Sequence, residues 1–237
     1  MVVERSNDGQ DGVTAVLCSG GLDSAVLVAH EARGGTVQPV YVSAGLAWER
    51  AEEARVARLL AAPAFAAGVH ELARLELPVT DVYPPTHWAL TGTPPAYNTP
   101  DSDVYLVGRN VLLLAKTAVY CALHGIPRVA VGPLAGNPFP DATPEFFAAM
   151  GHALSLGVDH AFEITAPFAQ LGKPDVIRIG AALDVPWELT LSCMNPAGVE
   201  HCGRCSKCRE RLQAFDAVGV ADPAPYAWRP ENVATGL

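Results

Sequence analysis

Short apolar runs alternate along the chain with longer segments in which apolar residues recur at helical spacing. The short runs are typical of buried strands, and the longer segments are typical of helices with one buried face. This pattern predicts strands at residues 14–17, 37–43, 69–77, 128–133, 160–166 and 187–192. It predicts helices at residues 23–33, 47–62, 109–124 and 173–183, and a further helix that begins at Pro144.

Capping residues agree with two of these helix boundaries. Thr143 is a favoured capping residue, and Pro144 directly after it is suited to a first helical turn. Gly125 and Pro127 follow the helix at 109–124, where glycine and proline commonly end a helix. The sequence therefore gives both a start and a stop signal for the middle of the chain.

Two segments are expected at the surface. In the helix at 47–62, the charged residues Glu49, Glu53 and Arg58 are predicted to lie on the exposed face. Residues 83–103 are rich in Pro, Thr and Tyr without clear periodicity and form the longest predicted loop. Such a loop can be a lid or binding loop, or an ordinary surface excursion, and both interpretations stay open.

The alternation of strands and helices predicts an α/β fold with a largely parallel sheet flanked by helices. In such folds ligands bind at the carboxyl ends of the strands. A chain of 237 residues can form one large domain with a small appendage.

The sequence CSGGLDSAVL, at residues 18–27, joins the first predicted strand to the first predicted helix. A glycine-rich turn before a helix offers free N–H groups and the positive end of the helix dipole, and both favour phosphate. The sequence matches neither GxxxxGK[ST] nor GxGxxG, the two common nucleotide-binding patterns. The alternative is a tight turn in which Asp23 or Ser24 only caps the helix.

Four cysteines late in the chain have the spacing C-x8-C-x2-C-x2-C: Cys193, Cys202, Cys205 and Cys208. Spacers of two residues let successive sulfurs converge on one ion, and Gly203 permits a tight turn. A closed structural zinc site with four thiolates fits this spacing, and an iron–sulfur cluster is the alternative. His201 would be a substitute ligand or, because four thiolates complete the shell, a bystander. Cys18 and Cys121 lie in apolar segments and are expected to be small core residues.

The charge and composition restrict the partners. The net charge of −9 argues against a broad grip on nucleic acid, although Arg204, Lys207, Arg209 and Arg211 cluster late in the chain. No apolar run has the length of a membrane span, and no export signal opens the chain. We therefore expect a cytoplasmic protein with no membrane partner, whose cysteines are metal ligands or free thiols rather than disulfides.

Together these features resemble the 7-cyano-7-deazaguanine synthase (QueC/ExsB) family of PP-loop, or N-type, ATP pyrophosphatases. The resemblance runs from about residue 13 to residue 226. It is carried by SGGLDS at 19–24, GRN at 108–110, Pro140-Asp141, Lys173 after Pro167-Phe168, Thr190-x-Ser192-Cys193, CGxCxxC at 202–208 and DPAPY at 222–226.

The resemblance implies both a fold and a reaction. The fold is a Rossmann-like adenine-nucleotide alpha-hydrolase fold, with an ATP pyrophosphatase domain at residues 1–190 and a small zinc-binding segment at 191–237 packed on it. In the reaction, ATP adenylates the carboxylate of 7-carboxy-7-deazaguanine, and ammonia replaces AMP to give an amide. A second ATP-dependent round dehydrates the amide to the nitrile, in queuosine biosynthesis. The implied cofactors are ATP, Mg²⁺ and Zn²⁺, and the family expectation is a homodimer.

The resemblance also implies roles for the residues around the loop. The loop N–H groups, with Ser19 and Ser24, would bind the leaving pyrophosphate, and Asp23 would position Mg²⁺. Lys173 would neutralise phosphate charge, or it is a solvated residue at a helix start. The predicted catalytic residues are Asp23, Ser24 and Lys173. The predicted ATP-binding residues are Leu17, Cys18, Ser19, Gly20, Gly21, Leu22, Asp23, Ser24, Ala25, Val26 and Leu27.

The predicted acceptor pocket lies between Arg109-Asn110 and residues 139–141. Phe139 would supply an apolar surface, and Asp141 would accept ring N–H protons of a purine-like ring. Arg109 would hold the substrate carboxylate, or it only braces the start of its helix. The predicted substrate-binding residues are therefore Arg109, Asn110, Phe139 and Asp141.

Three segments depart from the family pattern. Its Gly-Gln-x-His segment is here Gly-Leu-Ala-Trp-Glu at 45–49, its Val-Pro is Leu-Val at 106–107, and its Gly-Tyr-Pro-Asp-Cys is Pro-Phe-Pro-Asp-Ala at 138–142. These segments are where a substrate would be recognised. The alternative function is therefore a related ligase that stops at the amide or joins the activated acid to another amine.

Two further alternatives belong to other classes. A sulfur-transferring tRNA enzyme would need a nucleic-acid surface and a reactive cysteine outside the metal site. A non-catalytic, zinc-stabilised nucleotide-binding module would not need Asp23, Ser24 and Lys173, which are all present.

Overall fold

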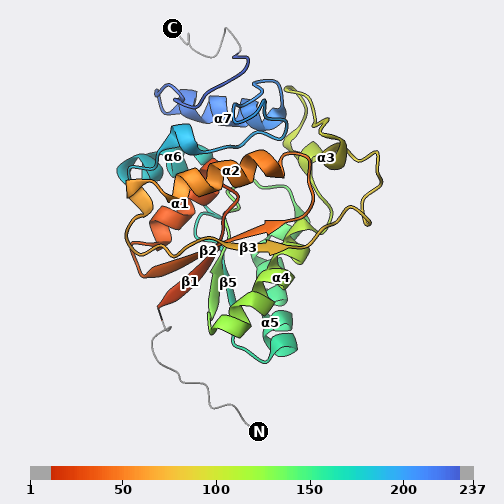
Figure 1. Cartoon of the computed structure of the whole chain (residues 1–237), viewed down its shortest axis with the longest axis vertical. Helices are drawn as coiled ribbons and strands as arrows, with labels where there is room; N and C mark the ends of the chain where they lie inside the picture. The colour runs from red at the N-terminus through yellow and green to blue at the C-terminus, as the bar shows by residue number, and fades with distance from the viewer. Residues whose placement is uncertain (1–11, 230–237) are drawn as a thin grey trace.

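The computed structural model describes residues 12–229 and is built on a five-stranded sheet (Figure 1). The strands lie in the order β3-β2-β1-β4-β5, and every neighbouring pair is parallel. Their bounds are β1 (Val13–Leu17), β2 (Thr36–Ser43), β3 (Ala73–Glu76), β4 (Arg128–Ala130) and β5 (Glu163–Thr165). The strand order reverses beside β1, and such a switch point opens a crevice at the carboxyl ends of the strands.

Helices cover both faces of the sheet (Figure 1). Helices α1, α2 and α6 pack on one face and α4 and α5 on the other, while α7 packs on α6. The α-helices are α1 (Leu22–Glu31), α2 (Glu49–Leu60), α3 (Trp88–Thr91), α4 (Arg109–His124), α5 (Pro144–Val158), α6 (Lys173–Ala182) and α7 (Ser206–Ala217). Short 3-10 helices are η1 (Pro63–Phe65), η2 (Asp101–Val104), η3 (Pro140–Ala142) and η4 (Trp187–Leu189).

The period-2 pattern of the strands explains the two cores. In β1, Val16 packs with the cluster formed by α1 and α6, whereas Ala15 packs with the cluster formed by α4 and α5. In β2, Tyr41 and Val40 divide in the same way. Because both faces are buried, these strands are predominantly apolar, as parallel strands usually are. The predicted α/β fold with a parallel sheet is confirmed.

The predicted helix ends are confirmed where capping signals marked them. Thr143 Oγ1 accepts a hydrogen bond from Phe146 N at 3.1 Å at the start of α5, and Pro144 occupies its first turn. Gly125, with a φ of 66°, ends α4 in the left-handed conformation that favours glycine.

The strand predicted at residues 187–192 is wrong. This segment contains η4 and then extended backbone that is not part of the sheet. Its polar groups bind elsewhere: Leu191 N donates to Gly20 O at 2.8 Å, and Trp187 O accepts from Arg211 Nη2 at 3.0 Å. Thr190 and Leu191 are buried, and the segment supports the loop after β1 through the bond from Leu191.

The prediction that Glu49 is exposed is also wrong, because Glu49 is only 7% exposed. Its Oε1 accepts from Ala44 N at 2.7 Å, and its Oε2 accepts from Gly45 N at 3.0 Å and Ser43 Oγ at 2.7 Å. The carboxylate thus satisfies N–H groups that the sheet leaves unpaired beyond β2. Arg58 is exposed, as predicted.

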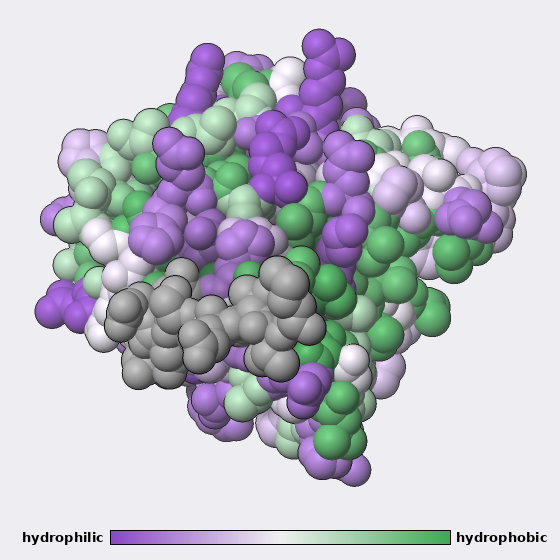
Figure 2. All heavy atoms as spheres, turned by 60° about the horizontal axis from the view of Figure 1, so that its bottom comes forward, coloured by the Kyte–Doolittle hydropathy of each residue, from purple (hydrophilic) through white to green (hydrophobic). Residues whose placement is uncertain are grey.

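No helix within residues 12–229 is long and apolar enough to cross a membrane. Figure 2 shows one face of the molecule, where hydrophilic side chains gather in the upper part and hydrophobic ones toward the right.

The segment predicted as one long loop, 83–103, contains α3 and most of η2, so it is partly helical.

Candidate functional site

A cleft of about 330 Å³ lies at the carboxyl ends of β1, β2 and β4. It is lined by the three predicted catalytic residues and all four predicted substrate-binding residues. Seven of the predicted ATP-binding residues line it as well: Leu17, Cys18, Ser19, Gly21, Leu22, Asp23 and Ser24. Ala25, Val26 and Leu27 are completely buried in the core, so they support the loop from behind. The topology thus brings together side chains from positions 17 to 207 of the chain.

The loop between β1 and α1 presents backbone to the cleft. Gly20 has a φ of 72°, a conformation that favours glycine. A Cβ atom there would also lie 2.6 Å from Val56 Cγ2, which is too close for any other residue unless Val56 moves. Gly21 begins α1 without a side-chain cap, and Ser24 Oγ donates back to Gly21 O at 3.1 Å. The alternative in which Asp23 or Ser24 caps the helix is therefore wrong. The uncapped first turn leaves N–H groups for an anion.

Lys173 joins this loop to the C-terminal part of the chain. Its Nζ lies 2.9 Å from Asp23 Oδ2 and also contacts Glu210 Oε1. Burial alone would lower the pKa of Lys173, but the two carboxylates raise it above its ordinary value. Its side chain is 15% exposed, so its interpretation as a solvated residue is wrong. The ammonium group is a fixed positive charge beside the loop.

Asp23 fits a role in binding a metal ion. Its second oxygen, Oδ1, is buried without a hydrogen-bond partner in the described structure. A buried, unpaired carboxylate oxygen is costly unless a ligand completes it. Mg²⁺ prefers such an oxygen, commonly together with phosphate oxygens of a nucleotide.

Arg109 stands at the start of α4 on the opposite side of the cleft. Its Nε is buried without a hydrogen-bond partner, and it forms no ion pair with residues 12–229. A cation at a helix N-terminus opposes the helix dipole, so its position needs another reason. A carboxylate in the cleft would supply one.

Asp141 has a structural role that the sequence did not reveal. Its Oδ2 accepts from Asn110 N at 3.0 Å, and its carbonyl oxygen accepts from Asn110 Nδ2 at 2.8 Å. These bonds cap α4, whose N-cap residue Gly108 has no side chain to do so. Oδ1 makes no hydrogen bond in the described structure, and Asp141 is one of the residues that line the cleft. Phe139 stacks on Tyr105 with ring centroids 5.1 Å apart.

Sequence reasoning missed three side chains of the cleft. Trp48 and Trp88 stack with centroids 5.6 Å apart, and both line the cleft. Glu52 is 8% exposed and accepts from Tyr41 Oη at 3.2 Å. Burial raises the pKa of Glu52 to about 7, against the opposing attraction of Arg109. The departure from the family pattern at 45–49 was the available signal for Trp48.

The four late cysteines form a cluster that could hold one metal ion. All four Sγ atoms lie within 4.8 Å of one another, and three pairs are separated by 4.0, 3.9 and 3.5 Å. A tetrahedral ion with bonds of about 2.3 Å places its sulfurs about 3.8 Å apart, so the cluster matches zinc. Sulfurs this close leave no room for the several ions of an iron–sulfur cluster.

His201 is a bystander to this cluster. Burial lowers its pKa to about 3, and the neutral ring accepts a hydrogen bond from Ser192 N at its Nε2, 3.1 Å away. The ring also stacks on Tyr226, with centroids 4.8 Å apart. Cys18 and Cys121 are buried core residues, as predicted, and no cysteine is in a disulfide.

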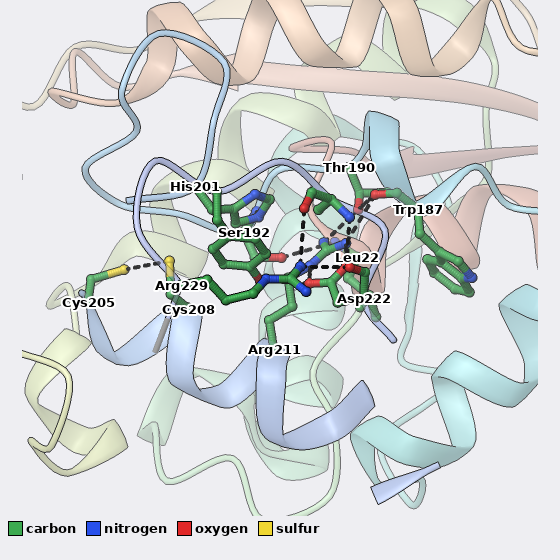
Figure 3. A network of polar contacts seen from close by, with 12 residues as sticks. Leu22, Trp187, Thr190, Ser192, His201, Cys205, Cys208, Arg211, Asp222 and Arg229 are labelled. Atoms are coloured by element: carbon green, nitrogen blue, oxygen red, sulfur yellow. Dashed lines mark hydrogen bonds and ion pairs between the residues drawn. The ribbon is translucent and has the colours of Figure 1, made fainter. Parts of the chain in front are cut away.

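A buried polar network connects the metal segment, the described residues 191–229 that include the four cysteines, to the loop after β1 (Figure 3). Arg211 donates to both carboxylate oxygens of Asp222 at 2.8 and 2.9 Å, and to Thr190 Oγ1 at 2.6 Å. Burial alone would raise the pKa of Asp222, but the hydrogen bonds from Arg211 lower it. Beyond Thr190, Ser192 Oγ accepts from Leu22 N at 3.5 Å. The first turn of α1 thus rests on the segment that leads into the metal cluster.

Comparisons with known proteins agree with this geometry. A family model described as "Queuosine biosynthesis protein QueC" matches residues 13–219. A 7-cyano-7-deazaguanine synthase of Methanopyrus kandleri is 34% identical over 231 residues, which cover 90% of this chain and 98% of that protein. One of Kineococcus radiotolerans is 33% identical, covering 91% of this chain and 98% of that protein.

Other similarities are shorter or weaker. A 7-cyano-7-deazaguanine synthase of Thermoplasma volcanium is 38% identical, over 56% of this chain and 57% of that protein. A solved structure from Methanocaldococcus jannaschii, described as a predicted subunit of tRNA methyltransferase, aligns with a TM-score of 0.44 and 13% identity. That alignment covers 72% of this chain and 74% of the other.

We expect one zinc ion per chain, and we expect Cys205→Ser to lose it. Removing one of four ligands should lower the melting temperature markedly, because metal binding contributes to folding free energy. Activity per folded molecule should fall less, because four thiolates leave no coordination position open for chemistry. Elemental analysis and thermal unfolding test this, with Cys121→Ser as a buried-cysteine control that keeps its zinc. Iron with inorganic sulfide in anaerobically purified protein would contradict the assignment.

Glu52 should make stability depend on pH. Its ordinary pKa is 4.5, and in the folded protein it is about 7, so between these values the folded state keeps a proton that the unfolded chain releases. Stability is therefore lost as pH rises through this window. Glu52→Gln stays neutral and should gain roughly 1–3 kcal/mol over the wild type between pH 5 and pH 8.

Urea unfolding at the two pH values measures this gain. Glu53→Gln is the matched control, because Glu53 is the neighbouring carboxylate, is more exposed than Glu52 and is paired with Arg74. An equal effect of Glu52→Gln at pH 5 and pH 8 would show that Glu52 does not titrate in this window.

Proposed function

The chain belongs to the QueC family of queuosine biosynthesis proteins, and we propose that it converts 7-carboxy-7-deazaguanine to 7-cyano-7-deazaguanine with ATP and ammonia. The observation that carries this proposal is that one cleft is lined both by an uncapped helix start with Lys173 and by Arg109, whose guanidinium forms no ion pair within residues 12–229. One side suits a polyphosphate and the other suits a carboxylate. An enzyme that adenylates an acid must hold both together.

The first step would join the acid to the nucleotide. A carboxylate oxygen attacks the α-phosphorus of ATP, and the bond to the pyrophosphate oxygen breaks. Charge then develops on the leaving pyrophosphate, where the N–H groups at the start of α1 and the Lys173 ammonium would stabilise it. Asp23, with its unpaired Oδ1, would hold Mg²⁺, which supplies further neutralisation of phosphate charge. Arg109 would orient the carboxylate for attack.

The same cleft would serve amide formation and the second ATP-dependent round. Ammonia attacks the acyl carbon, AMP leaves and a proton is released, which gives the amide. The amide oxygen then attacks a second ATP, pyrophosphate leaves, and loss of AMP and protons from nitrogen gives the nitrile. No additional nucleophile from the protein is required, because both rounds need positioning and stabilisation of leaving groups.

The alternatives are less well supported. Relatives aligned over nearly their whole length are named as the synthase, which disfavours a ligase that stops at the amide. A sulfur-transferring enzyme needs a reactive thiol outside the metal site. Burial raises the pKa of Cys18 to about 11 and that of Cys121 to about 12, so neither is a thiolate at neutral pH. A homodimer and a cytoplasmic location stay predictions.

We expect the wild type to release pyrophosphate from ATP when given 7-carboxy-7-deazaguanine and ammonium, and to form the nitrile. Asp23→Asn should slow this release by about a hundredfold or more, because it removes the carboxylate that would hold the Mg²⁺ ion neutralising the phosphate charge. Asp216→Asn, on the exposed side of α7, is the matched control and should behave as the wild type. Pyrophosphate release is measured with a coupled assay, and the product by mass spectrometry.

Two results would contradict the proposal. Turnover of another acid, with neither amide nor nitrile formed from 7-carboxy-7-deazaguanine, would show a different acceptor. Release of pyrophosphate by Asp23→Asn near the wild-type rate would remove Asp23 from the chemistry.

Asp141 should contribute to substrate affinity through Oδ1 and to stability through Oδ2. Asp141→Asn keeps a cap acceptor but loses the charge, so the KM for the deazapurine should rise about tenfold or more, since an unpaired buried polar group costs 1–3 kcal/mol. The KM for ATP should stay unchanged. Asp141→Ala should add a loss of about 1 kcal/mol of stability from the uncapped α4. An unchanged deazapurine KM in Asp141→Asn would reduce Asp141 to a helix cap.

A further inference from the structure

Lysine is rare in this chain and is concentrated at the cleft. The sequence has thirteen arginines but only three lysines, Lys116, Lys173 and Lys207. Lys173 and Lys207 both line the cleft, although they are 34 positions apart and come from α6 and α7. The ammonium group of lysine is a compact charge on a flexible stem, so it can move to contact different oxygens of a polyphosphate.

The two lysines are linked through one carboxylate. Glu210 Oε1 contacts Lys173 Nζ, and Glu210 Oε2 lies 2.6 Å from Lys207 Nζ. Asp23 extends the row at its other end, 2.9 Å from Lys173 Nζ. The row Asp23–Lys173–Glu210–Lys207 therefore alternates in charge and leads from the loop after β1 to the first turn of α7.

A purely structural role does not account for Lys207. Its side chain is 30% exposed, and the one ion pair that it forms within residues 12–229 is with Glu210, three positions along the same helix. Partly exposed pairs of this kind contribute little to stability. An ammonium group has three donors, and the described part of the chain uses one of them, so the others are available to an anion in the cleft.

The metal segment determines where Lys207 lies. The residue stands between Cys205 and Cys208, whose sulfurs belong to the cluster, and α7 begins at Ser206. The position of this first turn is fixed by the cluster at one end and by the buried Arg211 at the other. The C-terminal segment thus supplies a positive charge to a cleft that is otherwise built by the sheet.

We infer that Lys207 is a second phosphate-binding lysine, which Glu210 holds beside Lys173 so that the two ammonium groups both contact the polyphosphate of the nucleotide. This inference rests on the proposed use of ATP. It gives the metal segment a part in substrate binding, by position alone, and none in the chemical steps.

The test compares a nucleotide that carries the outer phosphates that Lys207 would reach with one that lacks them. Calorimetry measures the Kd of the α,β-methylene analogue of ATP with Mg²⁺, and the Kd of AMP, for the wild type and three variants. Lys207→Gln should weaken binding of the analogue about tenfold and leave AMP within about twofold. Lys207→Arg should restore binding to within about threefold. Lys116→Gln is the matched control, because Lys116 does not line the cleft, and both Kd values should stay unchanged.

Zinc content and melting temperature are measured for each variant, so that a disturbed cluster is recognised. Lys207→Gln that binds the analogue as the wild type does would overturn the inference and leave the proposed function intact. Equal loss of the analogue and AMP would also overturn it, because the effect would not come from the outer phosphates. A wild type that binds no analogue would instead overturn the proposed function and the inference with it.

Discussion

A guanidinium group in a protein interior must have its N–H groups paired, and Arg211 of α7, with no exposed surface, meets this requirement through two other segments of the chain. It binds both oxygens of Asp222, the hydroxyl of Thr190 and the carbonyl of Trp187 (Figure 3). Removing one partner of a buried ion pair commonly costs about 3–5 kcal/mol, far more than the pair itself contributes. The three segments are therefore constrained to meet at one point. From that point Leu191 N reaches Gly20 O, so the loop after β1 inherits its support from the C-terminal part of the chain.

One turn of α7 carries out three tasks because helical geometry separates its side chains. Cys208 faces the metal cluster, Arg211 points into the buried network, and Glu210 contacts Lys173 at the cleft. With 3.6 residues per turn, successive residues project about 100° apart around the helix axis, so Glu210 points about 160° away from Cys208, whereas Arg211 points about 60° from it. The metal cluster, the buried pair and the cleft are consequently coupled through one rigid element. A change in any one of them is expected to move the other two.

Much of this structure could be predicted from the sequence where a local rule decides. The alternation of apolar runs gave the parallel sheet, and SGGLDS gave the loop at its carboxyl edge. Errors arose where a distant partner decides instead. Residues 187–192 look like a strand because they are apolar, but Arg211 and Gly20 take their hydrogen bonds. Glu49 is charged and was therefore expected at the surface, but it is buried because its carboxylate accepts hydrogen bonds from N–H groups beyond the end of β2. Neither partner can be identified from the neighbouring sequence.

The two sides of the cleft differ in how freely they can change. On the side of the loop after β1, Gly20 has no room for a Cβ atom, and Asp23 and Lys173 belong to a row of alternating charges whose members need each other. The side proposed for the acceptor is built from stacked rings, Trp48 on Trp88 and Tyr105 on Phe139. Stacking tolerates exchange among aromatic residues better than a buried charge tolerates the loss of its partner. It is on this second side that the chain departs from the family pattern, at residues 45–49 and 138–142. Asp141 is retained there because the start of α4 depends on its carboxylate, whatever ring lies against the aromatic wall.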